Sequence, residues 1–250
     1  MITAIQKELE GLGDASRVDI LQRFFKTGPG EYGAGDRFRG IRVPVLRRLA
    51  RKYQDISLAD AGGLLQSPFH EDRLLALLVL ISHYQRGDQA IREKIHRFYL
   101  EHSRFVNNWD LVDASAPYLV GHYLENRQVD TLTRLAASPN LWERRIAIMA
   151  TFHFVKKNEF SEILRIARLL LDDPEDLIHK AVGWMLREVE KREPGVAENF
   201  LQKHYRHMPR TMLRYAIERL PEARRQAYLK GTVGLASNSA RRSSTASRLK

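Results

Sequence analysis

The chain has 250 residues, of which 44% are apolar, and its 41 basic against 30 acidic side chains give a formal net charge of +11. This apolar content supports a substantial core and excludes disorder for most of the chain, while the positive charge favours an anionic partner, foremost a nucleic acid. The absence of cysteine excludes disulfides, thiolate zinc sites and cysteine nucleophiles. The first ten residues are too acidic for a signal peptide and no segment is apolar enough to span a membrane. The sequence therefore predicts a soluble, cytoplasmic protein.

Residues 28–40 (GPGEYGAGDRFRG) predict a long irregular loop between the first helices and a helix that begins near Pro44. Its glycines are spaced somewhat as in phosphate-binding loops. However, no strand precedes the loop and no Gly-Lys-Ser/Thr follows it, so we predict no nucleotide site there.

Prolines mark a repeat from residue 68 onward. Pro68, Pro139, Pro174 and Pro209 are separated by 71, 35 and 35 residues, and one copy lacks its proline near residue 103. We expect each proline just inside a new helix, where its missing N–H costs nothing. A period of about 35 residues accommodates two helices and is typical of helical solenoids. With no hairpin signal, the sequence predicts an all-α, HEAT-like helical-repeat solenoid with a concave basic groove.

Each repeat proline is followed seven or eight residues later by an alanine, and a basic residue lies within three positions of that alanine. These basic residues are Arg73, Arg145, Lys180 and Arg214. Their recurrence supports the repeat.

Three clusters in the repeat region combine aromatic and charged residues: 107–113 (NNWDLVD), 141–147 (LWERRIA) and 180–188 (KAVGWMLRE). Trp109 and Asp113 are four residues apart and share a helix face. Each cluster holds one of the three tryptophans, which we expect at matching stages of the repeat. Taken singly, such residues are usually core or solvated charges, and we interpret Asp110 and Glu143 as acids that favour a helix N-terminus. Together, they offer ring faces, a carboxylate and guanidinium groups to a nucleotide.

These clusters, with residues 38–47 (FRGIRVPVLR), resemble the AlkD-type DNA alkylation repair glycosylases in order and spacing over about residues 1–230. The resemblance implies an all-helical HEAT-like enzyme that excises positively charged N3- and N7-alkylated purines, such as 3-methyladenine and 7-methylguanine, from double-stranded DNA. It implies catalytic-site roles for Asp113, Trp109, Trp184 and Arg145, and phosphate contacts for Arg187 and Arg47. Val43 departs from the pattern, since some members carry a hydroxyl next to the proline. Whether the damaged base is flipped out stays open.

No cofactor is implied, and we expect a monomer that works on the nucleoid. His204 and His207 lack a third ligand at a recognisable spacing, so we predict no metal site. Residues 231–250 predict a basic, disordered tail, and the remaining 1–230 keep a net charge of +7 without it.

Two alternatives stand beside the glycosylase. One is a noncatalytic HEAT-like binder of structured or damaged DNA, against which the presence of Trp109, Asp113, Arg145 and Trp184 argues. The other is a protein scaffold, which predicts an apolar or acidic groove instead of a basic aromatic one.

Overall fold

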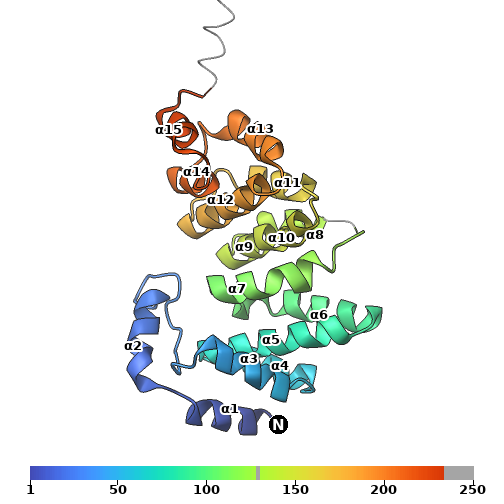
Figure 1. Cartoon of the computed structure of the whole chain (residues 1–250). Helices are drawn as coiled ribbons and strands as arrows, with labels where there is room; N and C mark the ends of the chain where they lie inside the picture. Colours follow the sequence, from blue (N-terminus) through green and yellow to red (C-terminus); the bar gives the residue numbers. More distant parts are fainter. Residues whose placement is uncertain (128–129, 234–250) are drawn as a thin grey trace, which may run out of the picture. The chain divides into compact units, whose positions relative to one another are not determined.

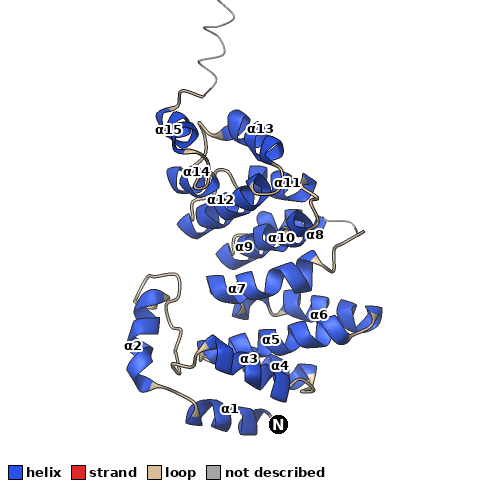
Figure 2. Cartoon of the chain, viewed as in Figure 1, coloured by secondary structure: helices blue, strands red, loops and turns tan. Residues whose placement is uncertain are grey.

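The computed structural model describes residues 1–127 and 130–233, and the predicted disordered tail lies almost entirely outside these ranges. Every regular element within them is helical, with a single isolated β-bridge between Arg37 and Phe69 (Figure 2). The predicted all-α class is therefore confirmed. Contacts divide the chain into two compact units, Met1–His153 and Phe154–Lys250. One continuous domain over 1–230 stays a prediction.

The first unit contains α1 to α9 together with two short turns of other helix types. Their bounds are α1 Ile2–Gly11, α2 Ala15–Phe24, α3 Val43–Lys52, α4 Leu58–Leu65, α5 His70–Arg86, α6 Gln89–Glu101, a 3₁₀ turn Ser103–Phe105, α7 Trp109–Ala116, a π turn Pro117–Gly121, α8 Asp130–Ala136 and α9 Leu141–Ala150. Helix α3 packs against α5, α5 against α7 and α7 against α9, while α4 packs on α5 and α8 on α9 (Figure 1). This order is that of stacked helical hairpins.

The second unit is arranged around α12, which contacts α11, α13 and α14. The bounds are α11 Ser161–Leu169, α12 Asp176–Glu190, α13 Pro194–His204, α14 Arg210–Ala216 and α15 Glu222–Lys230, and the boundary between the units falls inside α10, Phe152–Lys156. A Cβ at Gly183 would meet the backbone of Met212 and the Cβ of Tyr215. The glycine thus permits the close approach of α12 and α14. No helix in the described part of the chain is both long and apolar enough to cross a membrane.

The repeat prolines precede their helices. Helices α5, α9 and α12 begin two residues after Pro68, Pro139 and Pro174, and Pro209 is the N-cap of α14. The prediction that each proline lies inside the first helical turn is therefore wrong by one or two positions.

A recurring turn explains this displacement. The side chain before each of three prolines accepts a hydrogen bond from the backbone N–H two residues later, which closes a turn ahead of the helix. The pairs are Ser67 with Phe69 at 3.2 Å, Ser138 with Asn140 at 3.0 Å and Asp173 with Glu175 at 2.9 Å. The proline therefore belongs to the turn.

The same three repeats share a second contact, from a basic side chain to the carbonyl oxygen six residues before it. Arg73 donates to Ser67, Arg144 to Ser138, and the ring of His179 meets the carbonyl of Asp173. The equivalents of Arg73 are thus Arg144 and His179. Arg145 and Lys180 lie one position further along their helices.

The loop between α2 and α3 is organised around one buried carboxylate, that of Glu71 in the first turn of α5. Glu71 accepts hydrogen bonds from the backbone N–H groups of Arg39 (2.9 Å), Gly40 (2.8 Å) and Ile41 (3.1 Å). Gly40 has φ +84°, and a Cβ there would collide with the carbonyl of Asp14. The irregular loop predicted over 28–40 is confirmed, and its last residues are tied to α5.

Replacing Glu71 with alanine should lower the free energy of unfolding by about 3 kcal/mol, because three backbone donors lose a charged acceptor and two of them are buried. Urea denaturation of the full chain measures the change. The matched control is Glu93→Ala at an exposed position of α6, which should stay within about 0.5 kcal/mol of the parent. Equal effects of the two substitutions would contradict the assignment of Glu71.

Candidate functional site

Three of the predicted site residues come together in the first unit. Trp109 is the first residue of α7, Asp113 lies one turn further along it, and Arg145 extends from α9. The start of α7 is set by Asn108, whose side-chain oxygen accepts the Trp109 backbone N–H at 2.9 Å. This cap fixes where the helix begins and thereby which face carries Trp109 and Asp113.

Asp113 and Arg145 form a two-point ion pair between α7 and α9. Nε of Arg145 donates to Oδ1 of Asp113 at 2.9 Å, and Nη2 donates to Oδ2 at 2.8 Å. The Asp113 side chain is 15% exposed and that of Arg145 is 6% exposed. The parallel arrangement of both bonds fixes the carboxylate plane while leaving part of the carboxylate accessible.

The electrostatic surroundings of Asp113 oppose its negative charge. Burial raises the pKa of the carboxyl group above its ordinary value, the ion pair with Arg145 lowers it in part, and the nearby Asp110 raises it again. The net direction is upward. A carboxylate in this position accepts a proton more readily than one in water, and a further positive charge beside it would be stabilised.

Two aromatic side chains at the end of α2 pack against Trp109. Its ring stacks on Phe25 with centroids 5.4 Å apart and meets the edge of Phe24 at 5.8 Å. Trp109 remains half-buried. Phe25 therefore covers one face of the indole and Phe24 meets the ring edge-on, while part of the Trp109 side chain stays exposed.

The other predicted site residues lie elsewhere. Arg47 is exposed on α3 and makes no ion pair with a residue that the structure describes. Trp184 and Arg187 belong to α12 in the second unit, where Trp184 is half-buried and Arg187 is ion-paired with Glu218. Val43, the departure from the family pattern, is exposed at the start of α3.

The three tryptophans do not occupy matching stages of the repeat. Trp109 begins α7, whereas Trp184 is the ninth residue of α12. Trp142, the second residue of α9, is buried and meets the ring of Tyr32 edge-on at 6.1 Å. That expectation was wrong, and Trp142 is a packing residue.

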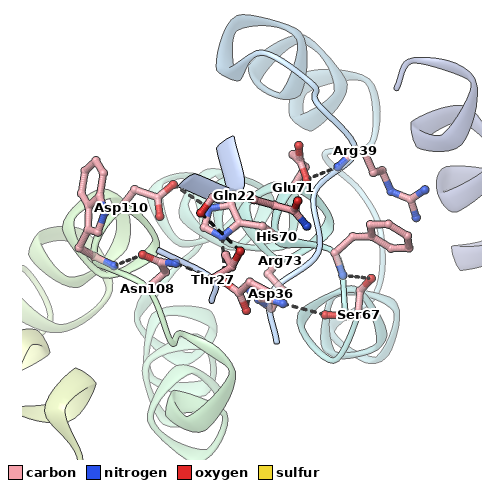
Figure 3. A network of polar contacts seen from close by, with 12 residues as sticks. Gln22, Thr27, Asp36, Arg39, Ser67, His70, Glu71, Arg73, Asn108 and Asp110 are labelled. Atoms are coloured by element: carbon pink, nitrogen blue, oxygen red, sulfur yellow. Dashed lines mark hydrogen bonds and ion pairs between the residues drawn. The ribbon is translucent and has the colours of Figure 1, made fainter. Parts of the chain in front are cut away.

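Sequence reasoning missed a buried ionic cluster that adjoins α7. His70, the first residue of α5, lies between two carboxylates, with Nε2 2.8 Å from Oδ2 of Asp110 and Nδ1 3.4 Å from Oδ2 of Asp36 (Figure 3). Arg73 pairs with the other oxygen of Asp36 at 2.7 Å, and Asn108 donates to Asp36 at 3.2 Å. The cluster joins the glycine-rich loop, α5 and α7. Asp110 is therefore more than an acid that favours a helix N-terminus.

The proton on His70 is held by its two acidic partners. Burial by itself lowers the pKa of the imidazole, but the hydrogen bonds to Asp110 and Asp36 outweigh burial and raise that pKa to about 9. His70 also holds down the pKa of Asp36, together with Arg73 and Asn108, against the opposing effect of burial. A signal for this cluster was present in the sequence, because four ionisable residues, 70–73, directly precede an apolar helical run.

Among residues 1–127 and 130–233, no group of three or more histidine or acidic side chains is arranged to hold a metal ion. His204 is half-buried and its ring lies 4.5 Å from that of Phe200, whereas His207 is exposed. The two histidines therefore lie in different surroundings.

Comparison with known proteins identifies the family to which this all-helical chain belongs. The family described as DNA alkylation repair enzyme matches residues 5–220. The chain therefore belongs to the DNA alkylation repair enzyme family.

Two solved structures share the fold. One is described as a predicted DNA alkylation repair enzyme from Enterococcus faecalis, with a TM-score of 0.65, 17% identity and coverage of 84% of this chain and 97% of that one. The other is AlkD2 from Streptococcus mutans, with a TM-score of 0.53, 17% identity and coverage of 82% and 97%. No curated protein matches the chain.

The raised pKa of His70 predicts a pH-dependent stability. Its contribution is present in full below the ordinary pKa of 6.5 and is lost as the pH rises through about 9. The shift corresponds to about 3 kcal/mol of unfolding free energy, measurable by urea denaturation across this pH range.

The substitution His70→Gln should remove this pH dependence. His96→Gln is the matched control, because His96 is also buried but burial lowers the pKa of its ring. A His70→Gln protein that lost the same stability as the parent between pH 6.5 and 9 would show that His70 is not the group responsible.

Proposed function

We propose that this member of the DNA alkylation repair enzyme family is a DNA glycosylase. Its substrates would be positively charged N3- and N7-alkylated purines, such as 3-methyladenine and 7-methylguanine, in double-stranded DNA. The observation that carries the proposal is Asp113, a buried but accessible carboxylate held by Arg145 one turn from Trp109. The net charge of +11 supports DNA as the partner.

The proposed reaction requires little from the protein beyond charge and position. An alkylated purine already carries a positive charge, so the bond between C1′ and the base nitrogen can break without protonation of the base. The bonding electron pair goes to the base and neutralises it, while the sugar becomes an oxocarbenium-like cation. Water then forms a bond to C1′ and loses its proton. No metal or cofactor takes part in this sequence.

Asp113 fits both demands of this reaction. Its negative charge would stabilise the developing sugar cation, and its raised pKa makes it a better acceptor for the proton of the attacking water. Because burial and Asp110 oppose the charge of Asp113 more than Arg145 favours it, a cation arriving beside it would be stabilised. This preference for a second cation supports alkylated, positively charged bases over neutral ones.

Arg145 and Trp109 would have supporting roles. Arg145 fixes the orientation of the Asp113 carboxylate through two hydrogen bonds and would attract a nearby phosphate. The part of the Trp109 indole that Phe25 leaves uncovered would pack on the lesion nucleotide and attract its positive charge.

The roles of Trp184, Arg187 and Arg47 remain proposals from the family resemblance. Arg47 is exposed on α3 and suits a phosphate contact. Arg187 would have to exchange its ion pair with Glu218 for a phosphate, so its contribution to DNA binding should be smaller than that of Arg47.

The second candidate is a noncatalytic binder of structured or damaged DNA. It is favoured by the ion pair itself, since a carboxylate engaged by Arg145 through both oxygens could serve only to join α7 and α9. The two candidates differ in whether any alkylated base is released.

Asp113→Asn should leave DNA binding largely intact and lower the release of 7-methylguanine and 3-methyladenine at least about 100-fold, since it removes ~3 kcal/mol or more of transition-state stabilisation. Incubation with methylated duplex DNA, with chromatographic analysis of the freed bases, measures this. Asp130→Asn makes the same change at an exposed position of α8 and should retain full activity.

Release at the parental rate by Asp113→Asn would refute the proposed role of the carboxylate. Absence of release by the parent protein from any alkylated DNA would favour the noncatalytic binder. Excision of uracil or hypoxanthine at comparable enzyme concentrations would refute the requirement for a positively charged base.

Arg47→Ala should weaken duplex binding and reduce the slope of log K against log salt by about one, as expected for one lost phosphate contact. Fluorescence anisotropy at several salt concentrations gives this slope. Arg97→Ala, at an exposed position of α6, is the control and should leave the slope unchanged. A slope unaffected by Arg47→Ala would remove this residue from the proposed interface.

A further inference from the structure

In the buried cluster around His70, the negative charge of Asp110 depends on the proton of His70 for its compensation. Arg73 compensates Asp36 through a 2.7 Å ion pair, so the protonated His70 is the cation that faces Asp110. The other oxygen of Asp110 is buried and has no hydrogen-bond partner within the described residues. A neutral His70 would therefore leave Asp110 with an uncompensated negative charge.

The ring of His70 is shielded from water by aromatic side chains. Phe38 stacks on it and Phe25 lies against it at a tilt, both with centroids 4.8 Å away. The His70 side chain is 3% exposed. Since water cannot screen charges in such surroundings, the charge state of His70 affects nearby groups more strongly than that of a surface histidine would.

The nearest consequence concerns α7. Asp110 and Asp113 are three residues apart on the same helix, a spacing at which like charges repel, and Asp110 raises the pKa of Asp113. Among the described residues, Arg145 on α9 and Tyr99 on α6 also interact with Asp113, and burial keeps Tyr99 neutral by raising the pKa of its phenol. Asp110 is thus the acidic neighbour whose effect on Asp113 can be changed through His70.

We propose that His70 is a positioning residue for Asp113: its proton, held between Asp36 and Asp110, compensates part of the charge of Asp110 and so limits how strongly Asp110 opposes the negative charge of Asp113. The proposal rests on the proposed function for its effect on excision, but the coupling between the two groups exists in the protein without DNA. A purely structural role would differ. If His70 only anchored the start of α7, its loss would lower the rate equally at every pH.

Two substitutions should shift the titration of Asp113 in opposite directions. His70→Gln leaves the charge of Asp110 uncompensated, so the acid limb of the profile of excision rate against pH should move to higher pH by about one unit. At pH values below this limb the excision rate should fall about tenfold. Asp110→Asn removes the like charge, so the limb should move to lower pH. His96→Gln, a buried histidine bonded to the Leu119 carbonyl, should leave the limb in place. Spontaneous depurination without enzyme is subtracted at each pH.

A direct measurement separates this proposal from the proposed function. Carbon-13 NMR of the aspartate carboxyl groups, assigned to Asp113 by comparison with Asp113→Asn, gives the titration of the full-length protein without DNA. We expect the Asp113 titration to rise in His70→Gln and to fall in Asp110→Asn, with circular dichroism confirming that both variants are folded.

An Asp113 titration that moved in neither folded variant, with the acid limb unchanged, would overturn the positioning role. Should the titration move as expected while no form of the protein releases a base, the coupling would stand and the proposed glycosylase function would fail.

Discussion

The structure depends on the burial of ionic side chains at the points where stacked helices begin. The first turn of α5 consists of His70, Glu71, Asp72 and Arg73, and all four are buried. A buried charge is costly unless partners compensate it, and each of these has such a partner. Asp72 pairs with Arg39 at 2.7 Å, and Glu71 accepts three backbone N–H groups. These contacts bind the long loop between α2 and α3 to the helical stack.

Ion pairs between largely buried side chains also join successive helices of the stack. His70 on α5 meets Asp110 on α7, and Asp113 on α7 meets Arg145 on α9. Two residues of one helical turn therefore connect α7 to both of its neighbours. Because the side chains of both pairs are largely buried, a change of charge at one position is felt more strongly at the next than it would be in water. One of these two ion pairs contains Asp113, the residue to which we assign the chemistry.

This arrangement suits a reaction whose substrate brings its own positive charge. A protein that must protonate a leaving group needs a general acid, but an alkylated purine can leave without one. What remains is to stabilise a cation and to accept a proton from water. A partly accessible carboxylate whose charge is opposed by burial and by Asp110 meets both needs.

The sequence by itself determined the helical class, the repeat and the candidate residues Trp109, Asp113 and Arg145, since periodicity, proline spacing and local motifs are properties of contiguous residues. It misplaced the prolines by one or two positions, because the turn that holds them forms through a side chain before the proline and an N–H after it. Only the tertiary structure decided that Arg145 meets Asp113, that Trp142 is buried packing, and that His70 lies between two carboxylates that raise the pKa of its ring. Asp36, His70 and Asp110 lie 34 and 40 residues apart. The pKa values of Asp36 and His70 depend on neighbours and burial that no local pattern encodes.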